Sequence, residues 1–119
     1  MKYISTRGAD GPLGYEDALL SGLARDGGLY LPTHYPRFDA DEIRSLSTLS
    51  YSALAGQIMS RFTDGEIDAD ELAGMAADAY ADFDDPAIAP LKHLEGDIHV
   101  LELFHGPTIA FKDYAMQFL

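Results

Sequence analysis

Residues 101–113 read LELFHGPTIAFKD, and this stretch decides how the rest of the chain is interpreted. Its order of residue types predicts a short buried strand, a turn at Gly106-Pro107 and the first turn of a helix. Thr108 is a candidate N-cap, because its hydroxyl can accept a hydrogen bond from the free N–H groups at a helix start. Lys112 then becomes about the fourth helical residue, close to an end whose partial positive charge disfavours a cation.

Two interpretations of Lys112 remain open from the spacing alone. On a helical wheel, Lys112, Asp113 and Gln117 share one polar sector, which is typical of an amphipathic helix with its lysine in water. Ile109 and Met116, however, flank Lys112 inside that sector. A lysine held among apolar groups beside a positive helix end would lose part of its preference for the charged form. Since a free amine has a pKa of about 10.4, lowering it would favour the neutral nucleophile that forms Schiff bases.

The same stretch resembles the pyridoxal-phosphate attachment segment of the threonine synthase family, in which the lysine of a Phe-Lys-Asp triplet holds the cofactor. The residues that match in register are His105, Gly106, Pro107, Thr108, Phe111, Lys112 and Asp113. Two stretches near the start, YISTRG at 3–8 and GLARDGGLYLP at 22–32, are also similar to the opening of these enzymes. Ile109 and Tyr114 differ from the residues expected most often at their places, and neither difference touches the chemistry.

The resemblance implies that the intact enzyme is a carbon-oxygen lyase that converts O-phospho-L-homoserine and water to L-threonine and phosphate, with pyridoxal 5'-phosphate as cofactor. Lys112 would hold this cofactor covalently at rest and carry protons during the reaction. Thr108 and Asp113 are implied cofactor contacts, although a helix cap explains Thr108 and charge neutralisation at a helix start explains Asp113. His105 is a candidate contact of substrate or cofactor, and a hydrogen-bonded structural histidine explains it equally well.

The resemblance also implies an α/β fold for the full enzyme, with a small N-terminal domain ahead of two lobes. Residues 1–85 are then a small, mainly helical N-terminal domain with short strands. Residues 86–119 are a linker and the truncated beginning of the cofactor-binding α/β domain. No capping residue ends the last predicted helix, so we expect a fragment cut inside that helix. Alone, it should be inactive and bind the cofactor weakly at most.

Hydrophobic periodicity and capping residues predict the elements of the first domain. They are a strand at 3–6, a helix at 15–24 that Asp26-Gly27-Gly28 stops, an extended run at 29–32, and helices at about 39–46, 51–62 and 68–83. The candidate N-caps are Asp39 or Asp41, Ser50, and Asp68 or Asp70. Asp84-Asp85-Pro86 ends the helical unit. Residues 98–104 then suit a strand in a sheet covered on both faces by helices.

The composition excludes several classes of function. Twenty acidic against eight basic residues give a formal charge of −12, which argues against nucleic acid or an anionic membrane as a partner. There are no cysteines, no apolar signal segment and no membrane-length run, so we expect a soluble cytoplasmic protein. The carboxylates at 64–71 do not match a calcium loop, and no metal is expected. Nothing in the sequence indicates an oligomeric state.

Two alternatives to the threonine synthase interpretation remain. A threonine-synthase-like phospholyase could share this whole region and release phosphate to give a keto acid. A chain of this length could also be an acidic helical interaction module without catalysis. The sequence that follows residue 119 would separate the synthase from the phospholyase. A glycine-rich phosphate loop of the cofactor site in that sequence would exclude the interaction module.

Overall fold

Two antiparallel helices, α3 (Tyr51–Thr63) and α4 (Ala69–Ala79), form the centre of the computed structural model, which describes residues 1–119. They pack closely because Gly56 of α3 lies against α4. A Cβ at Gly56 would come within 2.8 Å of the backbone nitrogen of Ala73 and 2.9 Å of its Cβ. Only glycine lets the two helix backbones approach this closely.

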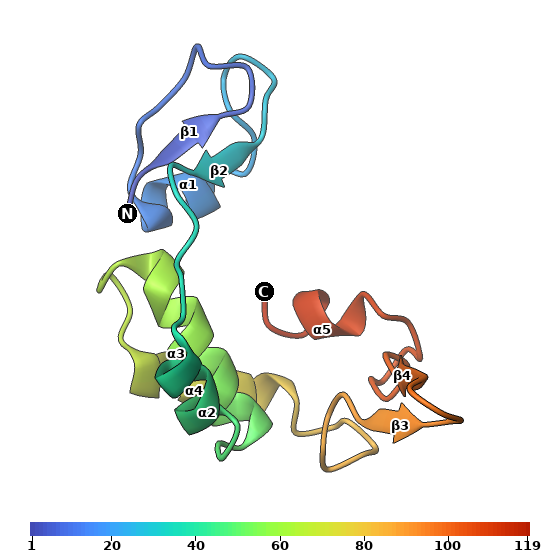
Figure 1. The fold of residues 1–119 in the computed structure, drawn as a ribbon. Coiled ribbons are helices and arrows are strands. Elements are labelled where there is room, and N and C mark those ends of the chain that lie inside the picture. Colours follow the sequence, from blue (N-terminus) through green and yellow to red (C-terminus); the bar gives the residue numbers. More distant parts are fainter.

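The remaining elements gather in groups on either side of this helix pair (Figure 1). They are β1 (Tyr3–Ser5), α1 (Tyr15–Ser21) and β2 (Tyr30–Pro32) on one side, α2 (Ala40–Leu46) against the pair, and β3 (Leu91–His93), β4 (His99–Leu101) and α5 (Asp113–Met116) on the other side. The mainly helical fold with short strands that the sequence predicts is therefore confirmed.

The first group is a two-stranded antiparallel sheet covered by one helix. β1 pairs with β2 in the register Tyr3 with Pro32 and Ser5 with Tyr30, and Tyr3 and Ser5 face inward. Helix α1 is shorter than predicted. It ends at Ser21 rather than at 24, because Gly22 takes a positive φ of 67° and caps the last turn.

Helix α1 has no N-cap side chain of its own. Its cap position is Gly14, and Glu66 from the turn between α3 and α4 supplies the missing acceptor. The Glu66 carboxylate accepts hydrogen bonds from Tyr15 N at 3.0 Å and from Glu16 N at 2.8 Å. These two backbone donors hold the pKa of Glu66 below its usual value. The contact ties the sheet group to the helix pair.

The other helix starts follow the capping residues of the sequence. Asp39 caps α2 in a full capping box with Glu42, Ser50 caps α3 and Asp68 caps α4. Helix α4 stops at Ala79 rather than at 83. Tyr80 and Phe83 nevertheless point inward as predicted, with exposed fractions of 8% and 9%.

An aromatic cluster joins residues 86–119 to the helical part. Tyr80 stands edge-on to Phe83 with the ring centroids 5.1 Å apart, and Phe83 stands edge-on to Tyr114 at 5.0 Å. The Tyr80 hydroxyl donates to the Tyr114 carbonyl at 2.8 Å, and the Tyr114 hydroxyl donates to the Ile88 carbonyl at 2.7 Å. The division at residue 85 stays a prediction, and these contacts cross it.

The prediction of a strand at 98–104, in a sheet covered on both faces by helices, is wrong both in the length of the strand and in its surroundings. Only His99–Leu101 is extended, and it pairs antiparallel with Leu91–His93 in a hairpin whose six residues are all exposed. A tight turn brings the two runs together, since Ile98 N bonds to the Glu95 carbonyl at 3.0 Å. No helix covers either face of this hairpin (Figure 1).

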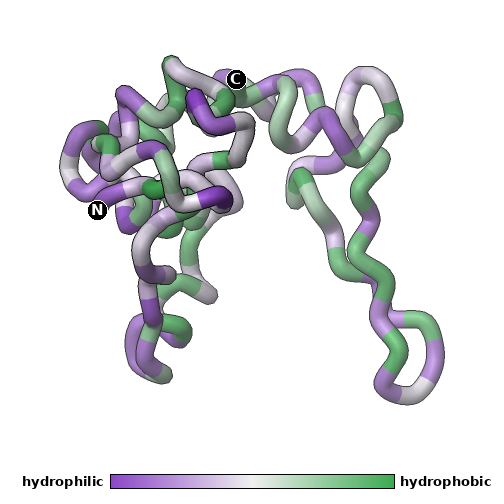
Figure 2. Tube along the Cα trace, turned by 90° about the horizontal axis from the view of Figure 1, so that it is seen from above, coloured by the Kyte–Doolittle hydropathy of each residue, from purple (hydrophilic) through white to green (hydrophobic).

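The chain is more open than a compact domain of its length. Its radius of gyration is 16.4 Å, whereas about 13.5 Å is expected for a compact chain of this size. Its accessible area is 8123 Å², against about 6,300 Å² for a folded monomer of equal mass. Figure 2 shows hydrophobic residues along the hairpin that projects from the rest of the chain. Much apolar surface therefore stays uncovered within these residues.

Candidate active-site segment

The segment 105–113 is folded by the buried carboxylate of Asp113. This carboxylate, 3% exposed, accepts hydrogen bonds from the Thr108 backbone N–H and from the Thr108 hydroxyl, both at 2.8 Å. A Cβ on Gly106 would overlap the Asp113 side chain. Glycine at 106 and aspartate at 113 are therefore both needed for the turn to close.

Asp113 is held in its charged form. Burial by itself would raise the pKa of its carboxyl, but its hydrogen bonds, first those from Thr108 and then those from Gln117 and Ala110, together outweigh burial and keep that pKa below its ordinary value. An ionised acceptor makes stronger hydrogen bonds than a neutral one. The turn is thus fixed by a charged group inside it.

Thr108 is not the N-cap that the sequence suggested. Helix α5 begins at Asp113, with Lys112 at the cap position and no side-chain capping bond. Residues 106–112 form turns, and Ile109 takes a positive φ of 62°, which a helix cannot contain. Instead, the Asp113 carboxylate accepts a hydrogen bond from the Thr108 N–H. The aspartate therefore holds the threonine in place, and the threonine does not cap a helix.

Lys112 lies at the surface of the chain. It is the last residue of the turn, its side chain is exposed, and its amine takes part in none of the five ion pairs. Ile109 and Met116 are exposed as well, at 73% and 63%. Of the two interpretations left open by the spacing, the one in which these side chains surround the amine does not hold within these residues. The exposure agrees with the alternative of a solvated lysine, and the role of Lys112 toward a cofactor stays a prediction.

His105 lies between two carboxylates. Its Nδ1 lies 2.5 Å from an Asp84 carboxylate oxygen and its Nε2 lies 2.8 Å from a Glu102 carboxylate oxygen, and both nitrogens donate when the ring is protonated. The bond to Glu102, and after it the bond to Asp84, raises the pKa of the imidazole. Both nitrogens are used within the chain, so the arrangement favours the structural histidine over a contact with substrate or cofactor. It fastens the turn of 105–113 to the end of the helical part.

We expect an NMR titration of His105 in the 119-residue chain to give a pKa above the ordinary value of about 6.5. Glu102→Gln should lower this pKa more than Asp84→Asn, because the Glu102 side chain is 19% exposed and the Asp84 side chain 76%, so water screens Asp84 more. Because the folded-state pKa is raised, the stability from this cluster is complete below about pH 6.5 and lost as the pH rises through the raised value. Equal effects of the two substitutions would contradict this account.

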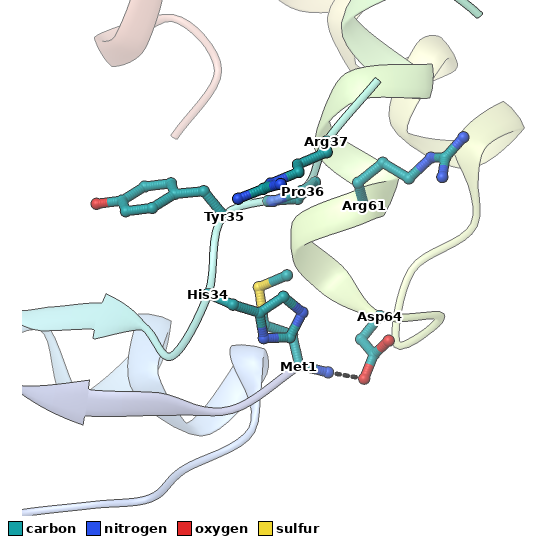
Figure 3. A pocket seen from close by; sticks show the side chains of 7 residues that line it. All are labelled: Met1, His34, Tyr35, Pro36, Arg37, Arg61 and Asp64. Atoms are coloured by element: carbon teal, nitrogen blue, oxygen red, sulfur yellow. Dashed lines mark ion pairs between the residues drawn. The ribbon is translucent and has the colours of Figure 1, made fainter. Parts of the chain in front are cut away.

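The largest depression of the chain lies elsewhere, between the sheet group and α3. Its volume is about 650 Å³, and its lining residues are Met1, His34, Tyr35, Pro36, Arg37, Arg61 and Asp64. Figure 3 shows that the Arg37 and Arg61 side chains extend in different directions and that the Met1 amine pairs with Asp64. Arg61 also pairs with Glu42 at 2.7 Å. The polar groups do not converge on a ligand, and none of the predicted site residues lies there.

The sequence did not reveal two of the partners found around the segment. Asp84 precedes His105 by 21 residues, and no spacing rule connects them. Glu102 lies three residues before His105, a spacing that signals contact only in a helix, whereas residues 102–105 are not helical. No group of three or more metal-binding side chains is present. No helix is long and apolar enough to cross a bilayer.

The family model described as threonine synthase N terminus matches residues 2–80. The chain belongs to the threonine synthase family. The threonine synthase of Pseudomonas aeruginosa is 50% identical over 119 residues, which are all of this chain and 25% of that protein. The threonine synthase of Schizosaccharomyces pombe is 43% identical over all of this chain and 23% of its own length.

Solved structures of threonine synthases agree with this fold over nearly the whole chain. The structure described as pyridoxal-phosphate-bound threonine synthase from Brucella melitensis superposes with a TM-score of 0.93 at 53% identity, over 99% of this chain and 25% of that one. The Escherichia coli threonine synthase gives 0.86 at 32% identity, over 100% and 28%. The chain thus spans about a quarter of the length of its relatives and matches their N-terminal portion.

Proposed function

We propose that the protein containing this chain converts O-phospho-L-homoserine and water to L-threonine and phosphate, as a carbon-oxygen lyase that uses pyridoxal 5'-phosphate. The observation that carries the proposal is the 50% identity to a threonine synthase across all 119 residues, including the segment around Lys112. The relative from Brucella melitensis, at 53% identity, is described as binding this cofactor.

The residues of the segment fit such a cofactor. The Lys112 amine is exposed and has no ion-pair partner, so it is available to join a carbonyl carbon. It ends a turn whose geometry the buried Asp113 fixes. When bound, the cofactor supplies an electron sink that lets protons leave the substrate carbons and phosphate depart. Lys112 would hold the cofactor at rest and carry protons at its Nζ atom afterwards.

Thr108 and Asp113 support the proposal in a narrower role than direct cofactor contact. The Thr108 N–H and hydroxyl are both engaged by Asp113, so a cofactor group that took either donor would have to compete with a charged acceptor. We infer that the pair sets the position of the Lys112 backbone. His105, bonded to Glu102 and Asp84, holds the start of the same segment.

The substrate proposal requires cationic groups beyond this chain. A phosphorylated substrate is an anion, whereas these 119 residues carry a formal charge of −12. The three lysines and five arginines are spread along the sequence, and only Lys112 lies in the candidate segment. We therefore propose that residues outside this chain bind the phosphate, that the chain alone is inactive, and that the whole protein acts in the cytoplasm without nucleic acid or membrane.

The test is a product analysis of the full-length protein supplied with pyridoxal 5'-phosphate and O-phospho-L-homoserine. We expect phosphate and L-threonine in equal amounts, and neither from the 119-residue chain under the same conditions. Phosphate accompanied by a keto acid instead of threonine would assign the phospholyase reaction. If the full-length protein formed neither product and showed no absorbance of a bound cofactor, the remaining function would be that of a non-catalytic interaction module.

A further inference from the structure

The β3–β4 hairpin presents two histidines directly opposite each other. His93 pairs with His99 in the antiparallel register, so their side chains lie on the same face of the hairpin. The ring centroids are 5.0 Å apart and the ring planes meet at 54°. Both residues are exposed. This pair plays no part in the segment around Lys112.

The backbone of the turn fixes which nitrogen of each ring is free. His93 Nε2 lies 2.7 Å from the Gly96 carbonyl oxygen, and His99 Nδ1 lies 3.3 Å from the Asp97 carbonyl oxygen. A carbonyl oxygen only accepts hydrogen bonds, so each of these nitrogens must carry the proton. In the neutral rings the lone pairs are therefore on His93 Nδ1 and His99 Nε2.

This arrangement is the one that orients imidazoles as metal ligands. A ligating histidine donates its other ring N–H to a carbonyl or carboxylate, which fixes the tautomer and leaves the opposite nitrogen free for the ion. Two histidines on neighbouring strands meet this condition here independently of each other.

We propose that His93 and His99 form a two-histidine site for a divalent late transition-metal ion such as Cu²⁺, Ni²⁺ or Zn²⁺. Imidazole nitrogen is a preferred ligand of these ions. Metal–nitrogen bonds of about 2.0–2.1 Å place two ligand nitrogens about 3–4 Å from each other, and ring centroids 5.0 Å apart are compatible with this separation. No third ligand is near, so water or a small anion completes the coordination shell.

The surroundings suit a cation. The turn between the strands carries Glu95 and Asp97, and the whole chain has a formal charge of −12. Lys92, the basic residue beside His93, pairs with Val100 on the opposite face of the hairpin, because successive side chains of a strand alternate. An ion at His93 and His99 would join two strands that are three residue pairs long. It would thereby stabilise a hairpin of marginal length.

The test uses the full-length protein, freed of metal and titrated with Cu²⁺ alone. We expect one Cu²⁺ ion per chain by calorimetry and two nitrogen ligands in its electron paramagnetic resonance spectrum. His93→Gln and His99→Gln should each weaken Cu²⁺ binding at least about tenfold. His34→Gln, a matched change of an exposed histidine outside the hairpin, should leave the affinity unchanged.

The proposal is overturned if the double variant His93→Gln/His99→Gln binds Cu²⁺ as tightly as the unchanged protein. That result would assign the ion to another group, such as the phosphate of a bound cofactor. A spectrum with fewer than two nitrogens, or affinity that depends equally on His34, would show an adventitious ion only. Because neither readout involves turnover, failure of this proposal leaves the proposed reaction untouched.

Discussion

Replacing Lys112 by alanine in the full-length protein should lower threonine formation by about 10³-fold or more, because one amine both holds the cofactor and transfers protons. Lys112→Arg should fail nearly as completely. The guanidinium keeps the positive charge but stays protonated, so it cannot act as a neutral nucleophile. Initial rates of phosphate release and the absorbance of the bound cofactor measure both effects.

Lys92→Ala is the matched control for this prediction. Lys92 is an exposed lysine of β3 with no ion pair, twenty residues before Lys112. Its removal changes the net charge by the same amount, and activity should stay within about twofold of the unchanged protein. If Lys112→Ala retained both the cofactor absorbance and the activity, the assignment of Lys112 would be wrong.

Substituting alanine at two helical glycines should change the stability of the 119-residue chain in opposite directions. Gly56→Ala places a methyl group against the α4 backbone at Ala69 and Ala73, which cannot move aside as a flexible side chain can. Overpacking of this kind costs about 1–3 kcal/mol. Gly74→Ala adds its methyl group where nothing lies within 4 Å, and should stabilise the chain by about 0.4–1 kcal/mol by restricting the unfolded state.

Urea unfolding followed by far-UV circular dichroism measures both glycine variants. The midpoint should fall for Gly56→Ala and rise for Gly74→Ala. The comparison isolates the helix contact, because both substitutions carry the same gain in helix propensity. A rise in the midpoint for both variants would mean that α3 and α4 do not approach at Gly56.

The capping residues made the helical part of the fold predictable from sequence. Asp39, Ser50 and Asp68 each accept hydrogen bonds from their own helix, so a local pattern was enough to find them. Helix α1 shows the limit of this approach. Its cap is Glu66, about fifty residues away, and no local rule finds an acceptor that tertiary packing brings in.

The candidate segment was recognisable by its residues, but its conformation was not. A run from Thr108 with helix-compatible spacing suggested one continuous helix, whereas the positive φ of Ile109 interrupts it. The buried Asp113 then turns back to bond Thr108. Periodicity describes regular elements only, and a turn held by one internal carboxylate has no period.

The surroundings of the Lys112 amine depend on more than local sequence, which left two interpretations open. Ile109 and Met116 flank Lys112 in the sequence, yet they are as exposed as the lysine. Residues 91–119 expose many large apolar side chains, and relatives of the family are about four times as long as this chain. We expect that residues of the full-length protein cover Ile109 and Met116 and provide the apolar surroundings of the amine.

The most direct test of the account is to locate the cofactor chemically. The full-length protein, loaded with pyridoxal 5'-phosphate, is reduced with borohydride, digested and analysed by mass spectrometry. The account predicts one modified peptide, containing residues 105–113, with the added pyridoxyl group on Lys112. A modified lysine anywhere else, with Lys112 unmodified, would contradict the central claim.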